Sequence, residues 1–336
     1  MGLVSRLGVI FVLFLSACGV GTADYVLPPG SGAGGGSVSG GGAGGGGGRL
    51  QVSTFQAVSS GLPSGFVPHG AALLDNTVYL GGDGIFTLDM SATQWVAASA
   101  PLNAGEVATS VTRDGTMVLV TVADAAGNHG GVLAYDFGPG TWRRTQAPDA
   151  PAYALLKKGT QLLLAAGDSL WASSDGDTWM KRSAGACVQG AVKFLVGSPA
   201  AQRIFSVAQS GLCYSDDQGM TWSTGLLGGD IIALAAADQY VLAVSTTDGA
   251  QRSDNYGATF HPFDPGATVS ALSMTSGEAF AVFAGGVRTS NDGGQTWSDG
   301  NDGLPSGTID SFLIAGNEVL ASMSGQLWLA QLQLAQ

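Results

Sequence analysis

Two octets of the chain place an aspartate between a serine and a threonine, SDDQGMTW at 215–222 and SNDGGQTW at 290–297. A carboxylate held beside hydroxyl groups could act as a general acid or base. A catalytic site uses such a carboxylate once, however, and this one returns along the chain. The recurrence therefore predicts a structural role for the octet.

The residue types of the octet suit a tight turn between two strands. Aspartate and serine oxygens accept hydrogen bonds from the backbone of their own turn. Glycine permits a positive φ, and tryptophan packs against a neighbouring sheet. A version one residue shorter, SSDGDTW, ends at residue 179. The residues expected to have these roles are Ser215, Asp217, Gly219, Trp222, Ser290, Asp292, Gly294, Trp297, Asp175 and Trp179.

Segments of this kind recur at intervals of 37 to 47 residues, ending at Trp95, Trp142, Trp179, Trp222, Phe260 and Trp297. The intervals hold short apolar runs, such as DIIALAAAD and QYVLAVSTT, separated by turns rich in Gly, Asp and Asn. Runs of this length and composition predict strands. Four strands per interval predict an all-β fold, a β-propeller of four-stranded antiparallel blades.

The two ends of the repeating region complement each other. GLPSG occurs at 61–65 and at 303–307, equally far from Phe55 and from Trp297. Phe55 therefore belongs to a blade whose other strands lie at the C-terminus. Pairing residues 50–59 with the strand around Trp328 would close the ring and remove two exposed edges. This composite blade brings the predicted number to seven.

The octets resemble Asp-boxes, also called bacterial neuraminidase repeats. Asp-boxes occur in sialidases, in sortilin-type receptors and in photosystem II assembly factors. The resemblance covers residues 50–336 and implies that the octets are folding devices at the turn between the third and fourth strands. It assigns no catalytic or cofactor-binding role to them.

The N-terminus is predicted to be a targeting segment followed by a spacer. Arg6, the apolar run LGVIFVLFL and the small residues before Cys18 form a pattern that resembles a bacterial lipoprotein signal. The resemblance implies a signal peptide at 1–17, lipidation of Cys18 and a membrane contact through the lipid anchor. Gly19 favours the outer membrane of the cell envelope. Residues 18–49 are expected to be a flexible, glycine-rich tether, and residues 50–336 the propeller.

The composition of the chain argues against a nucleic-acid partner. The formal net charge of −12 opposes binding of nucleic acid.

Cys187 and Cys213 remain once Cys18 is lipidated, and the sequence allows a disulfide between them in an oxidising compartment. Neither cysteine lies in a C-x-x-C motif, and no ligand cluster predicts a metal or another cofactor.

A catalytic site is not predicted, although a sialidase-like glycoside hydrolase is the alternative function. A sialidase needs three arginines that converge on the substrate carboxylate, together with a tyrosine and acidic residues. The arginines here are scattered along the repeats. The histidines, at 69, 129 and 261, are isolated in sequence. His129 lies in the longest loop between a second and a third strand.

Binding of a protein or glycan partner is the function that remains, and two surfaces are candidates for it. One is the face that carries the loop of His129 and the Pro- and Gly-rich connections between blades. The other is a basic patch formed by Arg143, Arg144, Lys157, Lys158, Lys181 and Arg182. Such cations could bind an acidic partner, or could simply protect edge strands from pairing.

Overall fold

The computed structural model of the chain describes residues 50–182, 187, 194–197, 203–208, 211–225, 227–276 and 278–334. The predicted signal peptide, Cys18 and the tether lie outside these residues. Every regular element that is described is a strand. The described part of the chain contains no helix long and apolar enough to cross a membrane.

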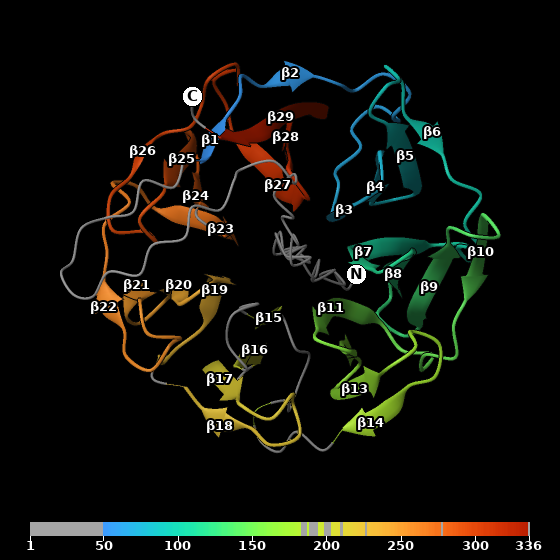
Figure 1. Ribbon diagram of the computed structural model, residues 1–336, viewed down its shortest axis with the longest axis horizontal. Coiled ribbons are helices and arrows are strands. Elements are labelled where there is room, and N and C mark those ends of the chain that lie inside the picture. The colour runs from blue at the N-terminus through green and yellow to red at the C-terminus, as the bar shows by residue number, and fades with distance from the viewer. Residues whose placement is uncertain are drawn as a thin grey trace, which may run out of the picture.

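The strands form seven antiparallel sheets arranged around a common axis, so the fold is a seven-bladed β-propeller, as predicted (Figure 1). Six blades have four strands in sequence order, with the first strand nearest the axis and the fourth at the rim. The seventh blade combines three C-terminal strands with two short N-terminal ones.

The strands of the first three blades have the following bounds: blade 1, β3 (Gly70–Leu74), β4 (Thr77–Gly81), β5 (Ile85–Asp89) and β6 (Val96–Ala97); blade 2, β7 (Glu106–Asp114), β8 (Met117–Asp124), β9 (Gly130–Asp136) and β10 (Thr141–Arg144); blade 3, β11 (Ala152–Lys158), β12 (Gln161–Ala166), β13 (Ser169–Ser173) and β14 (Met180–Arg182).

The remaining blades continue in the same order: blade 4, β15 (Phe194–Gly197), β16 (Ile204–Ala208), β17 (Gly211–Ser215) and β18 (Ser223–Thr224); blade 5, β19 (Ile231–Ala237), β20 (Tyr240–Ser245), β21 (Gly249–Ser253) and β22 (His261–Pro262); blade 6, β23 (Val269–Thr275), β24 (Glu278–Phe283), β25 (Gly286–Ser290) and β26 (Ser298–Asp299); blade 7, β27 (Ile309–Ala315), β28 (Glu318–Met323) and β29 (Gln326–Leu334), with β1 (Leu50–Val52) and β2 (Gln56–Ala57).

The antiparallel order gives the ring two different faces. The octet turns lie between third and fourth strands, on the same side as the turns between first and second strands; we call this side the octet face. The turns between second and third strands and the connections between blades lie on the other side, the loop face. Each blade starts on the loop face, because the preceding outer strand ends there.

The ring closes where β1 and β2 pair with β29, in register Leu50↔Leu334 and Ala57↔Trp328. This agrees with the predicted pairing of residues 50–59 with the C-terminal strand. The N-terminal segment forms two short strands, however, because residues 53–55 lie opposite only two residues of β29 and interrupt the ladder. Phe55 leaves the ladder there, is buried, and donates its N–H to the carbonyl of Asp302.

The two GLPSG segments have the same structural role. Gly61 and Gly303 both have a positive φ, and a Cβ on either would lie within 2.4 Å of a backbone oxygen. For Gly61 that oxygen belongs to Trp95, and for Gly303 it belongs to Phe55. Each glycine thus lets the backbone of the next blade's aromatic residue pass close by, which only a residue without a side chain permits.

The hydrophobic core is divided among the seven junctions between neighbouring blades. Each junction holds one apolar cluster and one aromatic residue of the repeat: Phe55, Trp95, Trp142, Trp179, Trp222, Phe260 or Trp297. The inner strands are rich in small residues, as in the IIALAAA of β19, which suits their close approach near the axis. Burial of these clusters is the main driving force that holds the blades together.

The innermost strand has a β-bulge near its start in five blades. The extra residues, which have no partner in the register, are Thr109, Tyr153, Ile232, Ser270 and Asp310. All five are at least partly exposed, whereas the residue before each of them is buried. The bulges therefore turn side chains out of the core at the end of the strand next to the loop face.

Candidate functional site

The octet aspartates are occupied by their own turns. Asp217 accepts hydrogen bonds from the hydroxyl of Ser215 (2.8 Å), from the N–H of Thr221 (2.8 Å) and from its hydroxyl (2.5 Å). Asp292 accepts the equivalent bonds from Ser290 and Thr296. The bonds from Thr221, first through its side chain and then through its backbone, lower the pKa of Asp217 to about 2. These carboxylates stabilise their turns as ionised acceptors.

The same arrangement is built without a charge in blade 5. There Asn255 accepts from the hydroxyl of Ser253 (2.9 Å) and from the N–H of Thr259 (3.0 Å). In the shorter segment of blade 3, Asp175 accepts from the N–H groups of Thr178 and Asp177, and these bonds lower its pKa to about 2. A neutral amide can replace the carboxylate, so the position supplies hydrogen-bond acceptors and not proton transfer.

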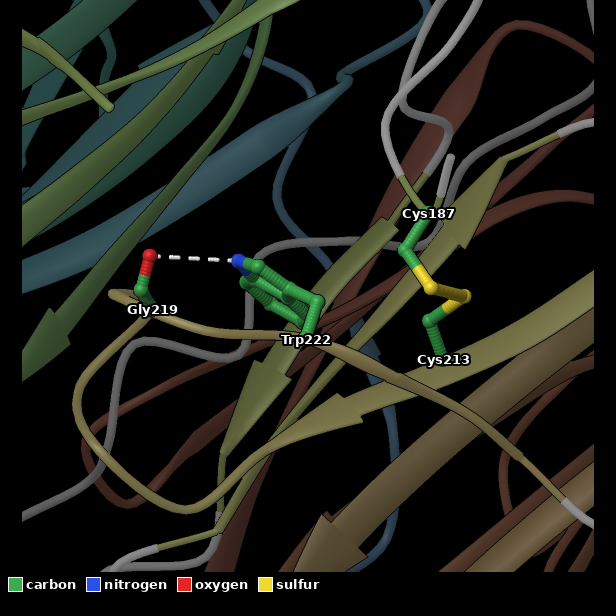
Figure 2. Close-up of a disulfide and its surroundings, with 4 residues drawn as sticks. All are labelled: Cys187, Cys213, Gly219 and Trp222. Carbon is green, nitrogen blue, oxygen red and sulfur yellow. Dashed lines mark hydrogen bonds between the residues drawn. A yellow bond between two sulfur atoms is a disulfide. The ribbon is translucent and has the colours of Figure 1, made fainter. Parts of the chain in front are cut away.

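The octet glycines and tryptophans complete the turns. The N–H of Gly219 bonds to Ser215 and that of Gly294 to Ser290, each at 2.8 Å. Both glycines have a positive φ. The indole N–H of Trp222 donates to the carbonyl of Gly219 at 3.1 Å (Figure 2), and Trp297 does the same with Gly294.

The predicted basic patch is not one surface. Arg144 pairs with Glu106, whereas Lys157 pairs with Asp114. Glu106 and Asp114 are the first and last residues of β7, so the two pairs lie about 26 Å apart at ~3.3 Å per residue. Arg143 pairs with both Asp136 and Asp177. Three of the six cations are thus neutralised at separate places.

The other three residues of the predicted patch do not restore it. Lys158 is buried, and this burial lowers its pKa. Lys181 is exposed, with its ammonium 6.0 Å from the centre of the Trp171 ring. Arg182 is partly buried, and its Nε has no hydrogen-bond partner within the described residues. Ion pairs and burial thus separate the six predicted residues, and the structure does not bring them together in one place.

The loop face contains a different polar arrangement between blades 2 and 3. His129 lies in the loop between β8 and β9, and its Nδ1 donates to a carboxylate oxygen of Asp149 at 3.0 Å. Asp149 comes from the connection between the two blades and also accepts from the N–H of Gly130. Asp124 supports the loop by accepting from the N–H groups of Asn128 and His129.

The hydrogen bond to Asp149 and the charge of that residue raise the pKa of His129. The same bond, followed by the bond from Gly130, lowers the pKa of Asp149. Both side chains are about two-thirds exposed. The pair can therefore exchange protons and hydrogen bonds with a molecule that approaches from solvent.

Arg144 fastens this region to the rest of blade 2. Its guanidinium donates to the carbonyl of Gly130 (3.1 Å) and to the carboxylate of Glu106 (2.5 Å). Glu106 is nearly completely buried and also accepts from the N–H and the side chain of Asn103. The ion pair, of which only Glu106 is buried, joins the loop of His129 to the connection between blades 1 and 2.

Tyr153 adds a phenol to the same place. It is the bulge residue of β11 and is partly exposed, although Ala152 and Ala154 are buried. Its hydroxyl lies next to the loop, 3.8 Å from where a Cβ on Gly127 would be. Burial and the charge of Asp124 raise the pKa of Tyr153, so it stays a neutral hydrogen-bonding group. We call Glu106, Asp124, His129, Arg144, Asp149 and Tyr153 the loop-face cluster.

The geometry expected for a sialidase is not found in the part of the chain that the structure describes. The described arginines that make hydrogen bonds share no partner with one another: Arg113, Arg143, Arg144, Arg203, Arg252 and Arg288. No three of them converge on one point. Across the same ranges, no group of three or more His, Cys, Asp or Glu side chains is placed to hold a metal ion.

A disulfide joins Cys187 to Cys213 in blade 4 (Figure 2). Their Cα atoms are 5.8 Å apart and both residues are buried. Cys213 lies on β17, the strand that leads into the octet of Trp222. The bond therefore ties Cys187, which precedes β15, to the third strand of its own blade, and closes a loop of 26 residues.

No model of a known protein family matches the chain, and neither does any curated protein. Solved structures do match it. YCF48 bound to D1 peptide has a TM-score of 0.64 and 16% identity, covering 85% of this chain and 99% of the other. YCF48 from Cyanidioschyzon merolae has a TM-score of 0.62 and 12% identity, covering 83% and 98%. A catalytically inactive virginiamycin B lyase from Staphylococcus aureus, with quinupristin, has a TM-score of 0.60 and 11% identity, covering 85% and 99%. At these identities the likeness establishes the fold alone.

Sequence reasoning identified the loop of His129 but not its partners. Asp149 and Tyr153 both lie in the segment APDAPAY, which was assigned to the loop face only as a Pro-rich connection. A bulge has no signature in one sequence, so the orientation of Tyr153 could not be predicted. Arg144 was assigned to a different surface, because its partner Glu106 lies 38 residues earlier.

Proposed function

We propose that the chain is a non-catalytic binding and assembly module that recognises a protein partner through its loop-face cluster. The observation that carries this proposal is that the cluster occurs once among the described residues, whereas the octet turns repeat around the ring. A rigid frame that presents one irregular polar surface is typical of propellers that bind partners. The neighbour YCF48, whose structure holds a D1 peptide, supports a protein partner by analogy of fold.

The proposal includes anchoring at a bacterial envelope membrane through acyl chains on Cys18. The sequence pattern of the first residues, with Arg6, an apolar run and small residues before Cys18, supports this. Residue 50 pairs with the end of β29 on the octet face. A tether that reaches this point would join the ring on the side opposite the cluster and leave the cluster accessible.

A photo-crosslinking experiment tests the binding surface. A photoreactive amino acid is placed at Ala126, in the exposed loop of His129, or at Gly138, in the exposed octet turn of the same blade. We expect covalent adducts with a specific protein in native envelopes from position 126 and none from position 138. Equal adducts from both positions, or none from position 126, would refute the loop face as the binding surface.

Metabolic labelling tests the anchor separately. Cells that express the wild-type chain or Cys18→Ser are fed an alkyne analogue of palmitate, and the isolated protein is examined for label. We expect the label on the wild-type protein only, together with release of the variant from the membrane fraction. Label retained by Cys18→Ser would disprove acylation of this cysteine without affecting the proposed loop-face function.

A further inference from the structure

A surface depression of about 420 Å³ lies on the outer part of blade 6, away from the loop-face cluster on blades 2 and 3. It is lined by Phe283, Gly285, Arg288, Trp297, Ser298, Asp299 and Asn301. Its volume is within the roughly 300–1,000 Å³ of small-molecule sites. None of these residues belongs to the loop-face cluster, although Gly285 and Asn301 lie on the loop-face side of blade 6.

Two aromatic side chains in the depression are held in place by neighbouring groups. The ring of Trp297 stacks on Phe263, with centroids 5.8 Å apart, and its indole N–H donates to Gly294. The guanidinium of Arg288 lies over the ring of Phe283 at 5.6 Å. Aromatic groups that are already fixed lose little conformational freedom when a ligand packs on them.

The charged groups of the depression are an Arg–Asp pair on adjacent strands. Arg288 on β25 and Asp299 on β26 are direct partners in the register. Arg288 donates through one terminal nitrogen to the carbonyl of Pro265. Asp299 accepts through one oxygen from the backbone and side chain of Asn301. The guanidinium keeps further N–H donors, and the second carboxylate oxygen is a further acceptor.

This combination selects the chemistry of the ligand. An anion that approaches Arg288 meets the charge of Asp299, and a cation that approaches Asp299 meets the charge of Arg288. Neighbouring hydroxyl groups have no such conflict, because each hydroxyl can accept from a guanidinium and donate to a carboxylate. The apolar C–H face of a sugar ring can pack on an aromatic side chain at the same time.

We infer that the blade 6 depression is a binding site for a neutral sugar, with Arg288 and Asp299 bonding adjacent hydroxyls and an aromatic wall packing on the ring. The site contains a single carboxylate, whereas hydrolysis of a glycosidic bond uses two. It therefore binds its sugar without cleaving it. The proposed protein partner at the loop-face cluster is a separate function.

Saturation-transfer NMR with purified protein tests the inference. The probes are the methyl glycosides of glucose, galactose, mannose and N-acetylglucosamine at millimolar concentration. We expect saturation transfer to at least one of them, and affinity about tenfold weaker for Asp299→Asn, which keeps the bond from the Asn301 backbone but loses an ionic acceptor. Asp264→Asn is the matched control, because Asp264 is exposed, lies outside the depression and likewise accepts from a backbone N–H two residues later.

Absence of transfer to every glycoside by the wild-type protein would overturn the inference, whatever the variants do. So would equal binding by wild type and Asp299→Asn, or an equal loss in Asp264→Asn. N-acetylphenylalanine amide serves as a probe that is not a sugar. Transfer to this compound but to no glycoside would also overturn the inference, and would indicate that the depression binds an aromatic side chain of a protein. A thermal melt of each variant verifies that the fold is retained.

Discussion

The octet face and the loop face are two ends of the same strands, yet they are built by different rules. On the octet face the same turn is made repeatedly, with a serine, an acidic or amide side chain, and a left-handed glycine. On the loop face the polar contacts between blades 2 and 3 have no copy elsewhere in the described ring.

The difference separates residues that stabilise the fold of every blade from residues that are specific to one place on this propeller. Repeated polar groups on the octet face are saturated by their own turns and have little capacity left for a ligand. In the loop-face cluster, by contrast, the paired side chains of His129 and Asp149 are about two-thirds exposed, so a molecule in solvent can reach them. Polar groups that recur from blade to blade therefore indicate a structural role. Polar groups found in one place, as in the loop-face cluster, indicate the candidate binding site.

The comparison of the two faces predicts that loss of an aromatic residue at a blade junction lowers the free energy of unfolding more than any other substitution considered. Trp95 is 2% exposed and its indole N–H donates to the carbonyl of Val58. We expect Trp95→Ala to lower the free energy of unfolding by about 3–5 kcal/mol, because it leaves a cavity between blades 7 and 1. Urea denaturation followed by circular dichroism measures it. The neighbouring Val96 is 62% exposed, so Val96→Ala serves as the control; equal losses in both variants would contradict the role of the junction.

Substitution of an octet aspartate is expected to have the next largest effect. Asp292→Ala removes an ionised acceptor and should destabilise by about 1–3 kcal/mol, whereas Asp292→Asn should cost less, because Asn255 fills the same position in blade 5.

The stabilisation by Asp292 should depend on pH. Burial alone would raise its pKa, but the bonds from the side chain and backbone of Thr296 lower it overall. A lowered pKa means that the stabilisation is present above the ordinary aspartate pKa of 3.8 and is lost as the pH falls through the lower folded-state pKa. Denaturation of wild type and Asp292→Ala from pH 7 down to pH 2 measures this; a difference that does not shrink would disprove the role of the charge.

Glu318 differs from the octet aspartates, although it also lies on the octet face, because its carboxylate does not have all its hydrogen bonds satisfied. It is 2% exposed, one oxygen accepts from Gln331 and the other has no hydrogen-bond partner in the described residues. Burial raises its pKa. Stability should therefore fall as the pH rises through the folded-state pKa, and Glu318→Gln should be more stable than wild type at pH 8 by a margin that disappears near pH 4. Melting temperatures at the two pH values measure the margin. A margin that is the same at both would show that ionisation of Glu318 is not involved.

The smallest expected effect concerns His129, on the other face. Asp149→Asn should lower the pKa of His129 toward the ordinary value of 6.5, because the bond to an ionised acceptor is lost. In the wild type, the charged pair is present below that value and is lost as the pH rises through the raised pKa. An NMR titration of the imidazole protons measures this, with His261→Ala used to assign the signals. Because both members of the pair are exposed, we expect no change in the melting temperature; a large decrease would assign the pair to folding.

The fold could be predicted to the number of blades, because it depends on features that a sequence displays directly. The aromatic residue that ends each repeat and the two GLPSG segments have fixed spacing, and spacing determines where each blade begins. The split of the N-terminal segment into β1 and β2 was not predicted, since it depends on the burial of Phe55 against blades 6 and 7.

The candidate site was much less predictable, because its contacts join residues that are distant in sequence and belong to no repeat. The basic residues of blades 2 and 3 are close in sequence, and that closeness suggested one surface. Adjacent residues of a strand point to opposite sides, so Arg143 and Arg144 reach different carboxylates. Lys157 and Lys158 end β11 of blade 3 on the octet face, whereas the guanidinium of Arg144 in blade 2 bonds to Gly130 at the loop-face end.

The pairing of β1 with β29 determines how the ring would respond to a mechanical load. A pull on the chain through residue 50, with the loop face held by a partner, acts along the axis of β1. The bonds to β29 would then be loaded together in shear, whereas a pull across the sheet would open them one at a time. The short N-terminal strands are thus oriented to transmit tension into the ring, and the serine contacts Ser53–Gln331 and Ser59–Leu327 would share that load.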